Sequence, residues 1–233
     1  MKKNVGIIGA SGRMGSLLSK LILDSEKYDL IQTKSFSDLF ASSDYIVDFS
    51  NKSLIHEILD SACITPKPLV ICTTGFDMQS IMGKLKMLAK SVPIVITPNT
   101  SIGATLQLYI TKIISDTLSN DFDIDIFEQH HKTKADLPSG TAINLKDALG
   151  KECTIHSKRA GNLPGEHEIT FTSNEEVISI KHIALDRVLF AKGAMRVLDW
   201  LTSNNPSPDL YTMFDVLRLS TATLVDKETQ KLA

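Results

Sequence analysis

Aromatic residues and net charge are both scarce in this sequence of 233 residues, and their scarcity excludes two classes of protein. Aromatic residues make up 6% of the chain, too few to favour a platform on which nucleic-acid bases stack. The formal net charge is −2, and acidic and basic residues are scattered along the whole chain. No face is therefore expected to attract phosphate backbone or anionic lipid, so neither nucleic acid nor a membrane is an expected partner.

Cysteines and long apolar runs are scarce as well. Cys63, Cys72 and Cys153 are odd in number and far apart, which fits neither a disulfide framework nor a four-cysteine zinc site. No stretch approaches the ~20 consecutive apolar residues that span a bilayer. The apolar run after the charged start is broken by Gly6 and Gly9, so no export signal is expected. These features predict a cytoplasmic protein with reduced thiols.

The first part of the chain alternates short apolar runs with helical patterns. β-Branched and aromatic residues predict strands at 5–8, 30–31, 45–47, 69–71 and 94–96. Between these strands, apolar residues recur at helical spacing over 14–22, 54–62 and 81–88. Apolar runs without alternation suit a parallel sheet that is covered on both faces. The order of strand and helix predicts a Rossmann-like domain.

The pattern changes beyond Thr97-Pro98-Asn99. A long helical pattern follows, with apolar residues at Leu106, Tyr109, Ile110, Ile113 and Ile114. Strands such as 122–127 and 177–183 then alternate apolar and polar residues, which predicts a sheet with one open face. The apolar side of these strands is expected to pair between subunits. A helical pattern over 187–201 and a short terminal helix complete the chain.

The predicted fold class is α/β, with a Rossmann-like parallel sheet domain plus a second α+β domain that has an open mixed sheet. Residues 1–99 are predicted to form a dinucleotide-binding domain, to which residues 188–233 return. Residues 100–187 are predicted to form the domain for substrate binding and oligomerisation.

A glycine-rich turn joins the first predicted strand directly to the first helix. It consists of Gly9, Ala10, Ser11, Gly12, Arg13 and Met14. Glycine lets the backbone turn tightly and approach a pyrophosphate, and the start of the helix offers N–H donors with a partial positive charge. The turn therefore predicts a dinucleotide site, although glycine turns of this kind also serve packing.

The end of the second predicted strand bears on the choice of cofactor. It carries Gln32, Thr33 and Lys34 where many such sites have an acidic residue for the ribose hydroxyls of NADH. Lys34 is a candidate partner for the 2′-phosphate of NADPH, and a solvated surface lysine is the alternative. Either NADPH or NADH is therefore an expected cofactor.

The segment from Glu128 to Ala142 combines proton carriers, cations and the start of a helix. Histidine titrates near neutral pH and can donate a proton, while a lysine can neutralise a carboxylate or supply a proton. A serine, glycine and threonine at the start of a helix gather hydroxyl and N–H groups where an anion binds. The candidate residues are His130, His131, Lys134, Ser139, Gly140 and Thr141.

Two plainer interpretations of this segment stay open. One is a basic loop followed by an ordinary capped helix. The other is a metal site, which is disfavoured because His130 and His131 diverge along a strand and no third ligand lies at a familiar spacing, so no metal is expected. The remaining histidines show no partner pattern and are interpreted as surface or packing residues: His56, His156, His167 and His182.

The pattern Glu-x-His-His-x-x-Lys-x-Asp-x-Pro-Ser-Gly-Thr-Ala over 128–142 resembles the signature of the 4-hydroxy-tetrahydrodipicolinate reductase family. The resemblance extends from the glycine turn nearly to the end of the chain. It implies that His130 and Lys134 are catalytic, with Lys134 also a carboxylate partner. It further implies that the substrate is bound by His131, Lys134, Ser139, Gly140 and Thr141.

Further segments resemble the family's cofactor contacts. Cys72-Thr73-Thr74 resembles a segment beside the nicotinamide ribose that usually begins with glycine. Thr97-Pro98-Asn99-Thr100 resembles the interdomain hinge, where an aromatic residue commonly stands at the position of Thr100. With Gly9 to Met14 and Lys34, these seven residues complete the predicted cofactor site.

The resemblance implies NAD(P)H-dependent reduction of 4-hydroxy-tetrahydrodipicolinate, a small dicarboxylate, in lysine and diaminopimelate biosynthesis. Hydride addition leaves an enamine that must gain a proton, and the resemblance implies that His130 and Lys134 manage this proton. It also implies a homotetramer. Two alternatives stay open: another two-domain NAD(P)-dependent amino-acid dehydrogenase, and a sensor that binds NADPH without chemistry.

Overall fold

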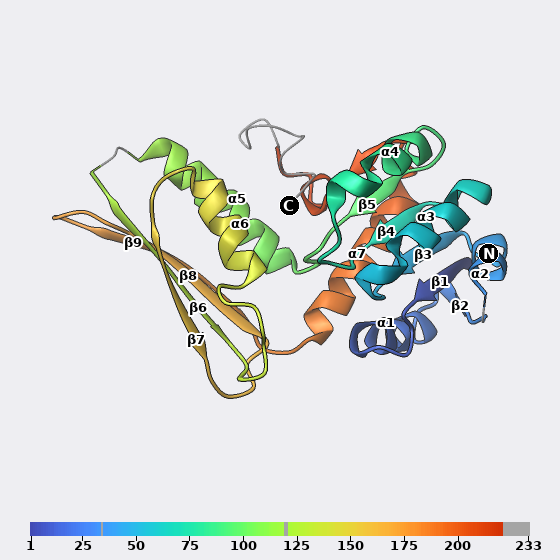
Figure 1. Cartoon of the computed structure of the whole chain (residues 1–233), viewed down its shortest axis with the longest axis horizontal. Coiled ribbons are helices and arrows are strands. Elements are labelled where there is room, and N and C mark those ends of the chain that lie inside the picture. Colours follow the sequence, from blue (N-terminus) through green and yellow to red (C-terminus); the bar gives the residue numbers. More distant parts are fainter. Residues whose placement is uncertain (34, 119–120, 221–233) are drawn as a thin grey trace. The chain divides into compact units, whose positions relative to one another are not determined.

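The computed structural model of the chain describes residues 1–33, 35–118 and 121–220. The chain forms two compact units (Figure 1). The first unit comprises Met1–Thr100 together with Phe190–Arg218, and the second comprises Ser101–Leu189. The sequence-based boundaries, after residues 99 and 187, lie one and two residues earlier, and the roles given to the two parts stay predictions.

The first unit contains a sheet of six strands in which every neighbouring pair is parallel. In spatial order the strands are β10 (Leu210–Tyr211), β5 (Ile94–Ile96), β4 (Leu69–Ile71), β3 (Tyr45–Asp48), β1 (Lys3–Ile8) and β2 (Tyr28–Ile31). The chain moves to opposite sides of β1 when it forms β2 and β3. Ligands of such sheets bind outside the carboxyl ends of the strands at this switch point.

Helices cover both faces of the parallel sheet. Successive strand residues point to opposite faces, so Val47 packs in one core while Ile46 packs in the other. The first core includes residues of α1 (Arg13–Leu23), α7 (Val188–Asn204) and α8 (Met213–Val216). The second core includes residues of α2 (Phe36–Ser42), α3 (Ile55–Ile64) and α4 (Met78–Leu88), and a short 3₁₀ helix, η1 (Lys52–Leu54), precedes α3. The predicted Rossmann-like domain is confirmed.

The second unit contains a mixed sheet of four strands. In spatial order they are β7 (Thr154–Arg159), β6 (Asp123–His130), β8 (Gly165–Thr172) and β9 (Val177–Ala184). β6 and β7 are parallel, and the other pairs are antiparallel. Two helices, α5 (Ile102–Thr117) and α6 (Gly140–Leu149), cover one face (Figure 1). The prediction of a second domain with an open mixed sheet is confirmed.

The apolar side of this sheet does not pair with a subunit, and that expectation is wrong. Ile126 and Phe171 are fully buried against Leu145 of α6, so helices of the same chain cover the apolar side. The open side is formed mainly by polar residues, such as Asp125 and Glu168. An alternating strand shows which residues share a face but not what covers that face.

The buried face of α5 also differs from its apolar pattern. Leu106 is 41% exposed, whereas Gln107 is buried. The amide nitrogen of Gln107 donates hydrogen bonds to the carbonyl oxygens of His167 and Ile180, at 2.8 and 3.0 Å. Because these bonds satisfy carbonyl groups of β8 and β9, a polar residue of α5 faces the sheet.

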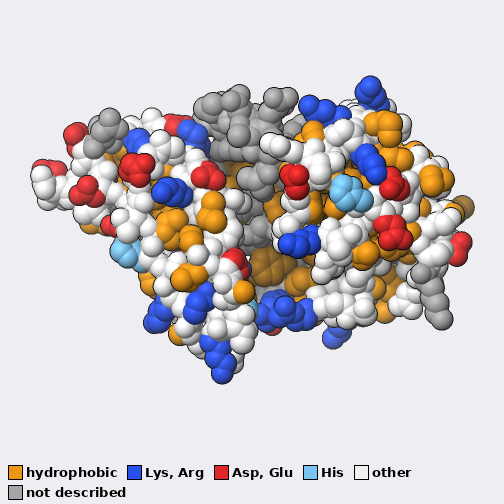
Figure 2. All heavy atoms as spheres, in the orientation of Figure 1, with side chains coloured by type: hydrophobic (Ala, Val, Ile, Leu, Met, Phe, Trp, Pro, Cys, Tyr) orange, Lys and Arg blue, Asp and Glu red, His pale blue; other side chains and the backbone are white. Residues whose placement is uncertain are grey.

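The surface shows no dominance of one charge on the face drawn in Figure 2, where Lys and Arg side chains lie among Asp and Glu over both units. Within the ranges that the structure describes, no helix is both long enough and apolar enough to cross a membrane.

Candidate active site

The alternation of β6 places an acid and a histidine on the covered face of the second sheet. Glu128 and His130 share this face with Ile124 and Ile126, whose packing against α6 fixes which side of the strand is buried. Glu128 has no exposed surface, and His130 is 6% exposed. Two titratable groups therefore lie beside the apolar core of this unit, at the end of the strand.

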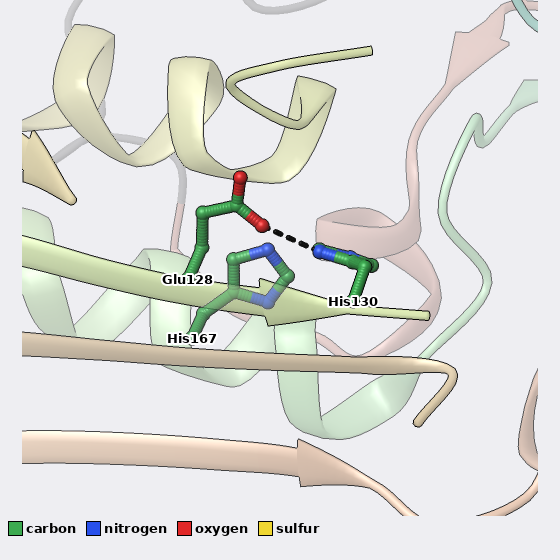
Figure 3. A group of neighbouring side chains, drawn as sticks. All are labelled: Glu128, His130 and His167. Atoms are coloured by element: carbon green, nitrogen blue, oxygen red, sulfur yellow. Dashed lines mark hydrogen bonds and ion pairs between the residues drawn. The ribbon is translucent and has the colours of Figure 1, made fainter. Parts of the chain in front are cut away.

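The carboxylate of Glu128 is bound from three directions. Arg159, on β7, binds both of its oxygens, with nitrogen–oxygen distances of 2.7 and 2.8 Å. The Nδ1 atom of His130 lies 2.5 Å from Oε2 (Figure 3). The backbone N–H of Ser139 donates to Oε1 at 3.3 Å. One carboxylate thus connects the candidate acid to the start of α6.

Ser139 caps α6 and connects it to β8. Its hydroxyl oxygen accepts a hydrogen bond from the backbone N–H of Ala142 at 3.2 Å, the arrangement typical of an N-cap. The same oxygen lies 3.0 Å from Nε2 of His167. Gly140 and Thr141 begin the helix, whose N-terminal end carries a partial positive charge. This end is suited to a substrate carboxylate.

Lys134 and His131 lie in the loop between β6 and α6, and both bind loop residues. The ammonium of Lys134 lies 2.8 Å from a carboxylate oxygen of Asp136. Nδ1 of His131 lies 2.8 Å from the hydroxyl of Thr133. A substrate carboxylate could bind Lys134 beside Asp136, because an ammonium has three N–H donors, or could take the place of Asp136. This exchange is feasible because the Asp136 side chain is 51% exposed.

The electrostatics of the site favour the charged form of Glu128 and disfavour the protonated forms of His130 and His167. Burial lowers the pKa of His130, and the charges of Lys134 and Arg159 lower it further, while Glu128 acts in the opposite direction. Burial acts to raise the pKa of Glu128, but hydrogen bonds led by that of Arg159 outweigh it and the pKa is lowered. Burial lowers the pKa of His167 to about 3, with a further contribution from His130.

A metal ion is disfavoured here although three ligand types come together. Ligand atoms of Glu128, His130 and His167 lie within 4.8 Å of one another (Figure 3). Both oxygens of Glu128 already bind the guanidinium of Arg159. A metal ion would have to displace this cation, so the arrangement favours an ion pair. The absence of a bound metal stays a prediction.

The glycine turn lies at the carboxyl end of β1, where the fold favours a ligand. Gly9 has a φ of +81°, and a Cβ atom there would lie 2.5 Å from the carbonyl oxygen of Phe49. A Cβ atom on Gly15 would lie 2.1 Å from the carbonyl oxygen of Gly9. No side chain among the described residues caps α1, which begins after Gly12. The backbone donors of this turn therefore suit the pyrophosphate of a dinucleotide.

The ends of neighbouring strands add polar groups at the same edge of the sheet. Asp48, at the end of β3, is fully buried, and burial raises the pKa of its carboxyl group. Hydrogen bonds from Ser50 and from Thr73, beyond β4, act in the opposite direction. These polar groups lie at the carboxyl ends of the strands, where such a sheet binds its ligands. These observations fit a nicotinamide dinucleotide.

The other predicted cofactor residues fall into three groups. Ala10, Ser11, Arg13 and Met14 lie in or directly after the glycine turn, as predicted from their order. Cys72, Thr74, Thr97, Pro98 and Asn99 follow β4 and β5, whose carboxyl ends meet at the same edge. Lys34 lies outside the described residues.

Thr100 has a structural contact of its own. Its hydroxyl donates to the carbonyl oxygen of Phe190 at 2.7 Å, and the residue is 2% exposed. A Cβ atom on Gly193 would lie 1.7 Å from the carbonyl oxygen of Thr100, so glycine is required where α7 passes this backbone. A contact of Thr100 with nicotinamide stays a prediction.

Two family models together match most of the chain. The model of the dihydrodipicolinate reductase N-terminus matches residues 25–100, and the model of the C-terminus matches residues 103–217. The chain belongs to the dihydrodipicolinate reductase family. The resemblance inferred from the sequence is confirmed.

Two named relatives agree with the assignment to the dihydrodipicolinate reductase family. The 4-hydroxy-tetrahydrodipicolinate reductase of Chlamydia abortus is 39% identical, and the match covers 89% of this chain and 95% of the relative. The reductase of the same name from Rickettsia bellii is 37% identical, with 91% and 93% covered.

A solved structure supports the fold. A dipicolinate-bound dihydrodipicolinate reductase from Paenisporosarcina sp. TG-14 superposes with a TM-score of 0.75 at 20% identity and covers 92% of this chain and 99% of its own. A scyllo-inositol dehydrogenase from Lactobacillus casei has a TM-score of 0.59 at 12% identity and covers 98% and 96%. At these identities the likeness concerns the fold alone.

Three residues in this member of the dihydrodipicolinate reductase family were given no role from the sequence. Glu128 and Arg159 form the buried ion pair, and His167 contacts both Ser139 and His130, whose ring centroid lies 5.0 Å away. The alternating pattern of β8 could have indicated that His167 is buried, because this residue shares its face of the strand with Ile169 and Phe171. The pairing of Glu128 with His167 depends on strand register, which composition does not reveal.

Proposed function

We propose that this chain reduces 4-hydroxy-tetrahydrodipicolinate to tetrahydrodipicolinate in the lysine and diaminopimelate pathway, with His130 and Lys134 as the catalytic residues. Membership of the reductase family supports the activity and its dependence on NADH or NADPH. The observation that carries the assignment of residues is the buried contact of His130 with Glu128, at the point where α6 begins.

The dicarboxylate substrate meets two kinds of positive group in the second unit. Lys134 offers an ammonium, and the start of α6 at Ser139, Gly140 and Thr141 offers backbone N–H groups and a helix dipole. His131 lies in the same loop and completes the proposed substrate contacts. Two carboxylates can be held separately by these groups, which would orient the ring between them.

A nicotinamide dinucleotide would supply the hydride when bound. After that step His130 gives the proton on Nε2 to a ring carbon of the enamine, so that a C–H bond forms and Nε2 keeps the electron pair. Solvent then returns a proton to Nε2. Lys134 neutralises a substrate carboxylate. Gly9 to Met14, Cys72 to Thr74 and Thr97 to Thr100 would hold the dinucleotide, and Lys34 would meet a 2′-phosphate.

The active form is proposed to be a cytoplasmic homotetramer. Because α5 and α6 cover the apolar side of the second sheet, subunit contacts through this sheet would use its open side. That side carries Phe127, Val177 and Ile183 among polar residues, and the latter two are 61% and 42% exposed. Sedimentation that shows only a monomer would contradict the tetramer.

A coupled assay tests the activity. Dihydrodipicolinate synthase generates the substrate in the cuvette, and the loss of NADPH absorbance is followed. His130→Gln is expected to lower turnover by ~10²- to 10⁴-fold, the usual contribution of a positioned acid, while cofactor affinity stays unchanged. The exposed His56, on α3, provides the matched control as His56→Gln. Wild-type turnover in the His130 variant would refute the role of His130.

The same assay separates the proposal from the alternatives. A nucleotide sensor would bind NADPH without consuming it. An amino-acid dehydrogenase would act on a different substrate, and family membership disfavours it. Comparing NADPH with NADH for the wild type and Lys34→Ala tests cofactor preference, because equal affinities throughout would remove any role of Lys34.

A further inference from the structure

Glu128 contacts two parts of the site that the proposed reaction uses for different purposes. Its Oε2 lies 2.5 Å from Nδ1 of His130, the proposed acid. Its Oε1 accepts a hydrogen bond from the backbone N–H of Ser139, where the proposed carboxylate site begins. The side chain is fully buried, so solvent does not compete for either oxygen. A shift of this carboxylate would therefore move both parts together.

The charge state of Glu128 determines the tautomer of His130. An ionised carboxylate only accepts hydrogen bonds, so the Nδ1 atom beside it must carry a proton. The guanidinium of Arg159 binds both oxygens of Glu128 and stabilises the ionised form. Nε2 of His130 is then the atom that gains and loses a proton. Gly165 leaves space beside this atom, since a Cβ atom at that position would lie only 2.9 Å from Nε2 of His130.

We infer that Glu128 is a positioning residue of the proposed reductase, which orients His130 with its exchangeable proton on Nε2 and holds the start of α6 in the matching place. The inference rests on the proposed function. Arg159 acts through Glu128, because its guanidinium binds the carboxylate of Glu128. The same guanidinium donates a hydrogen bond to the backbone carbonyl oxygen of Asp136. Figure 3 shows Glu128 and His130 side by side on β6, with the ring of His167 next to them.

The structure also predicts how Glu128 affects the pH dependence of turnover. The charged or titratable groups around His130 are Glu128 on the same strand, Arg159 on β7, His167 on β8 and Lys134 in the loop. Among these, Glu128 alone favours the protonated imidazole. Removing its charge should make His130 lose its proton at lower pH. The basic limb of the rate profile should therefore move to lower pH.

A purely structural role is the competing explanation, because Glu128 also neutralises the guanidinium of Arg159, whose side chain is 14% exposed. Glu128→Gln alone would leave Arg159 without its partner, and such a change is often strongly destabilising. The double variant Glu128→Gln/Arg159→Met removes both charges and keeps side chains of similar volume. It should fold, so its kinetics can be compared with those of the wild type at equal folded fraction.

The first experiment measures turnover against pH for the wild type, the double variant and the control Glu176→Gln, whose side chain is exposed in the turn between β8 and β9. In the double variant we expect turnover to fall at least about 10-fold, a part of what a positioned acid contributes. We expect its basic limb to move to lower pH, because Glu128 raises the pKa of His130 more strongly than Arg159 lowers it. We also expect its KM for the substrate to rise. An unchanged profile with wild-type KM would overturn the inference.

A second experiment does not depend on activity. Nitrogen NMR of the ¹⁵N-labelled imidazoles reports which ring nitrogen carries the proton, and the signal that is absent in His130→Gln identifies His130. We expect a proton on Nδ1 in the wild type and a mixture of tautomers in the double variant. Identical tautomers in both proteins would overturn the inference. Failure of the wild type to consume NADPH would instead refute the proposed function and leave this result unaffected.

Discussion

The buried imidazole of His167 predicts that the protein loses stability in mild acid. His167 is 4% exposed, and burial lowers its pKa from 6.5 to about 3. In the unfolded chain the same side chain takes up a proton near its ordinary value. Below pH 6.5 the unfolded state therefore binds more protons than the folded state, so the free energy of unfolding falls as the pH falls and levels off near pH 3.

The magnitude follows from the size of this shift. Each pH unit between the two pKa values of His167 contributes about 1.36 kcal/mol. A decrease from pH 6.5 to 5 should therefore cost about 2 kcal/mol, and the whole interval down to pH 3 about 5 kcal/mol. The full loss is comparable with the net stability of many domains, which is about 5–15 kcal/mol.

Urea unfolding at pH 7 and pH 5 measures this effect in the wild type and in His167→Gln. The variant has no imidazole at this position, so its free energy of unfolding should fall by about 2 kcal/mol less than that of the wild type over this interval. His56→Gln, on the exposed side of α3, controls for the loss of a histidine elsewhere. Equal losses in wild type and His167→Gln would show that the buried ring does not resist protonation.

Three further predictions concern glycines. Gly15→Ala should abolish tight NADPH binding and lower the melting temperature, because its Cβ atom would lie 2.1 Å from a backbone oxygen. Gly83→Ala, whose Cβ atom would have nothing within 4 Å, should instead raise stability by about 0.5–1 kcal/mol. Fluorescence titration measures the affinity and thermal unfolding the stability, and NADPH affinity retained in Gly15→Ala would contradict the prediction. Gly165→Ala should displace the ring of His130, because its Cβ atom would lie 2.9 Å from Nε2, and turnover should fall at least about 10-fold with cofactor affinity unchanged. Full turnover would contradict the placement of Nε2.

The sequence predicted the elements of the first unit well because their signals are local. The apolar runs at 45–47 and 69–71 lie in β3 and β4, and the helical spacing over 81–88 lies in α4. β10 was not predicted, since two residues carry too little pattern to indicate a strand. Its pairing with β5 depends on where α7 delivers the chain, which is a property of the tertiary structure.

The second unit was harder to predict where polar residues are buried. The apolar pattern of α5 gave prominence to Leu106, yet Gln107 faces the sheet because its amide satisfies two carbonyl groups. Hydrophobic periodicity cannot detect a buried amide that is hydrogen-bonded. In the same way, the signature segment indicated His130 and Ser139, but not Arg159, which lies on another strand. That residue becomes visible only through the pairing of β6 with β7.

Strand register connects the core of the second unit to its chemistry. Glu128 and His130 have the same parity along β6 as Ile124 and Ile126, so burial of the two isoleucines decides where the acid and the imidazole point. A slip of one residue would turn all four to the open side of the sheet. The pairing of Glu128 with His167 would be lost in the same step. Substitutions that disturb this core should therefore reduce turnover through the orientation of His130 before they unfold the protein.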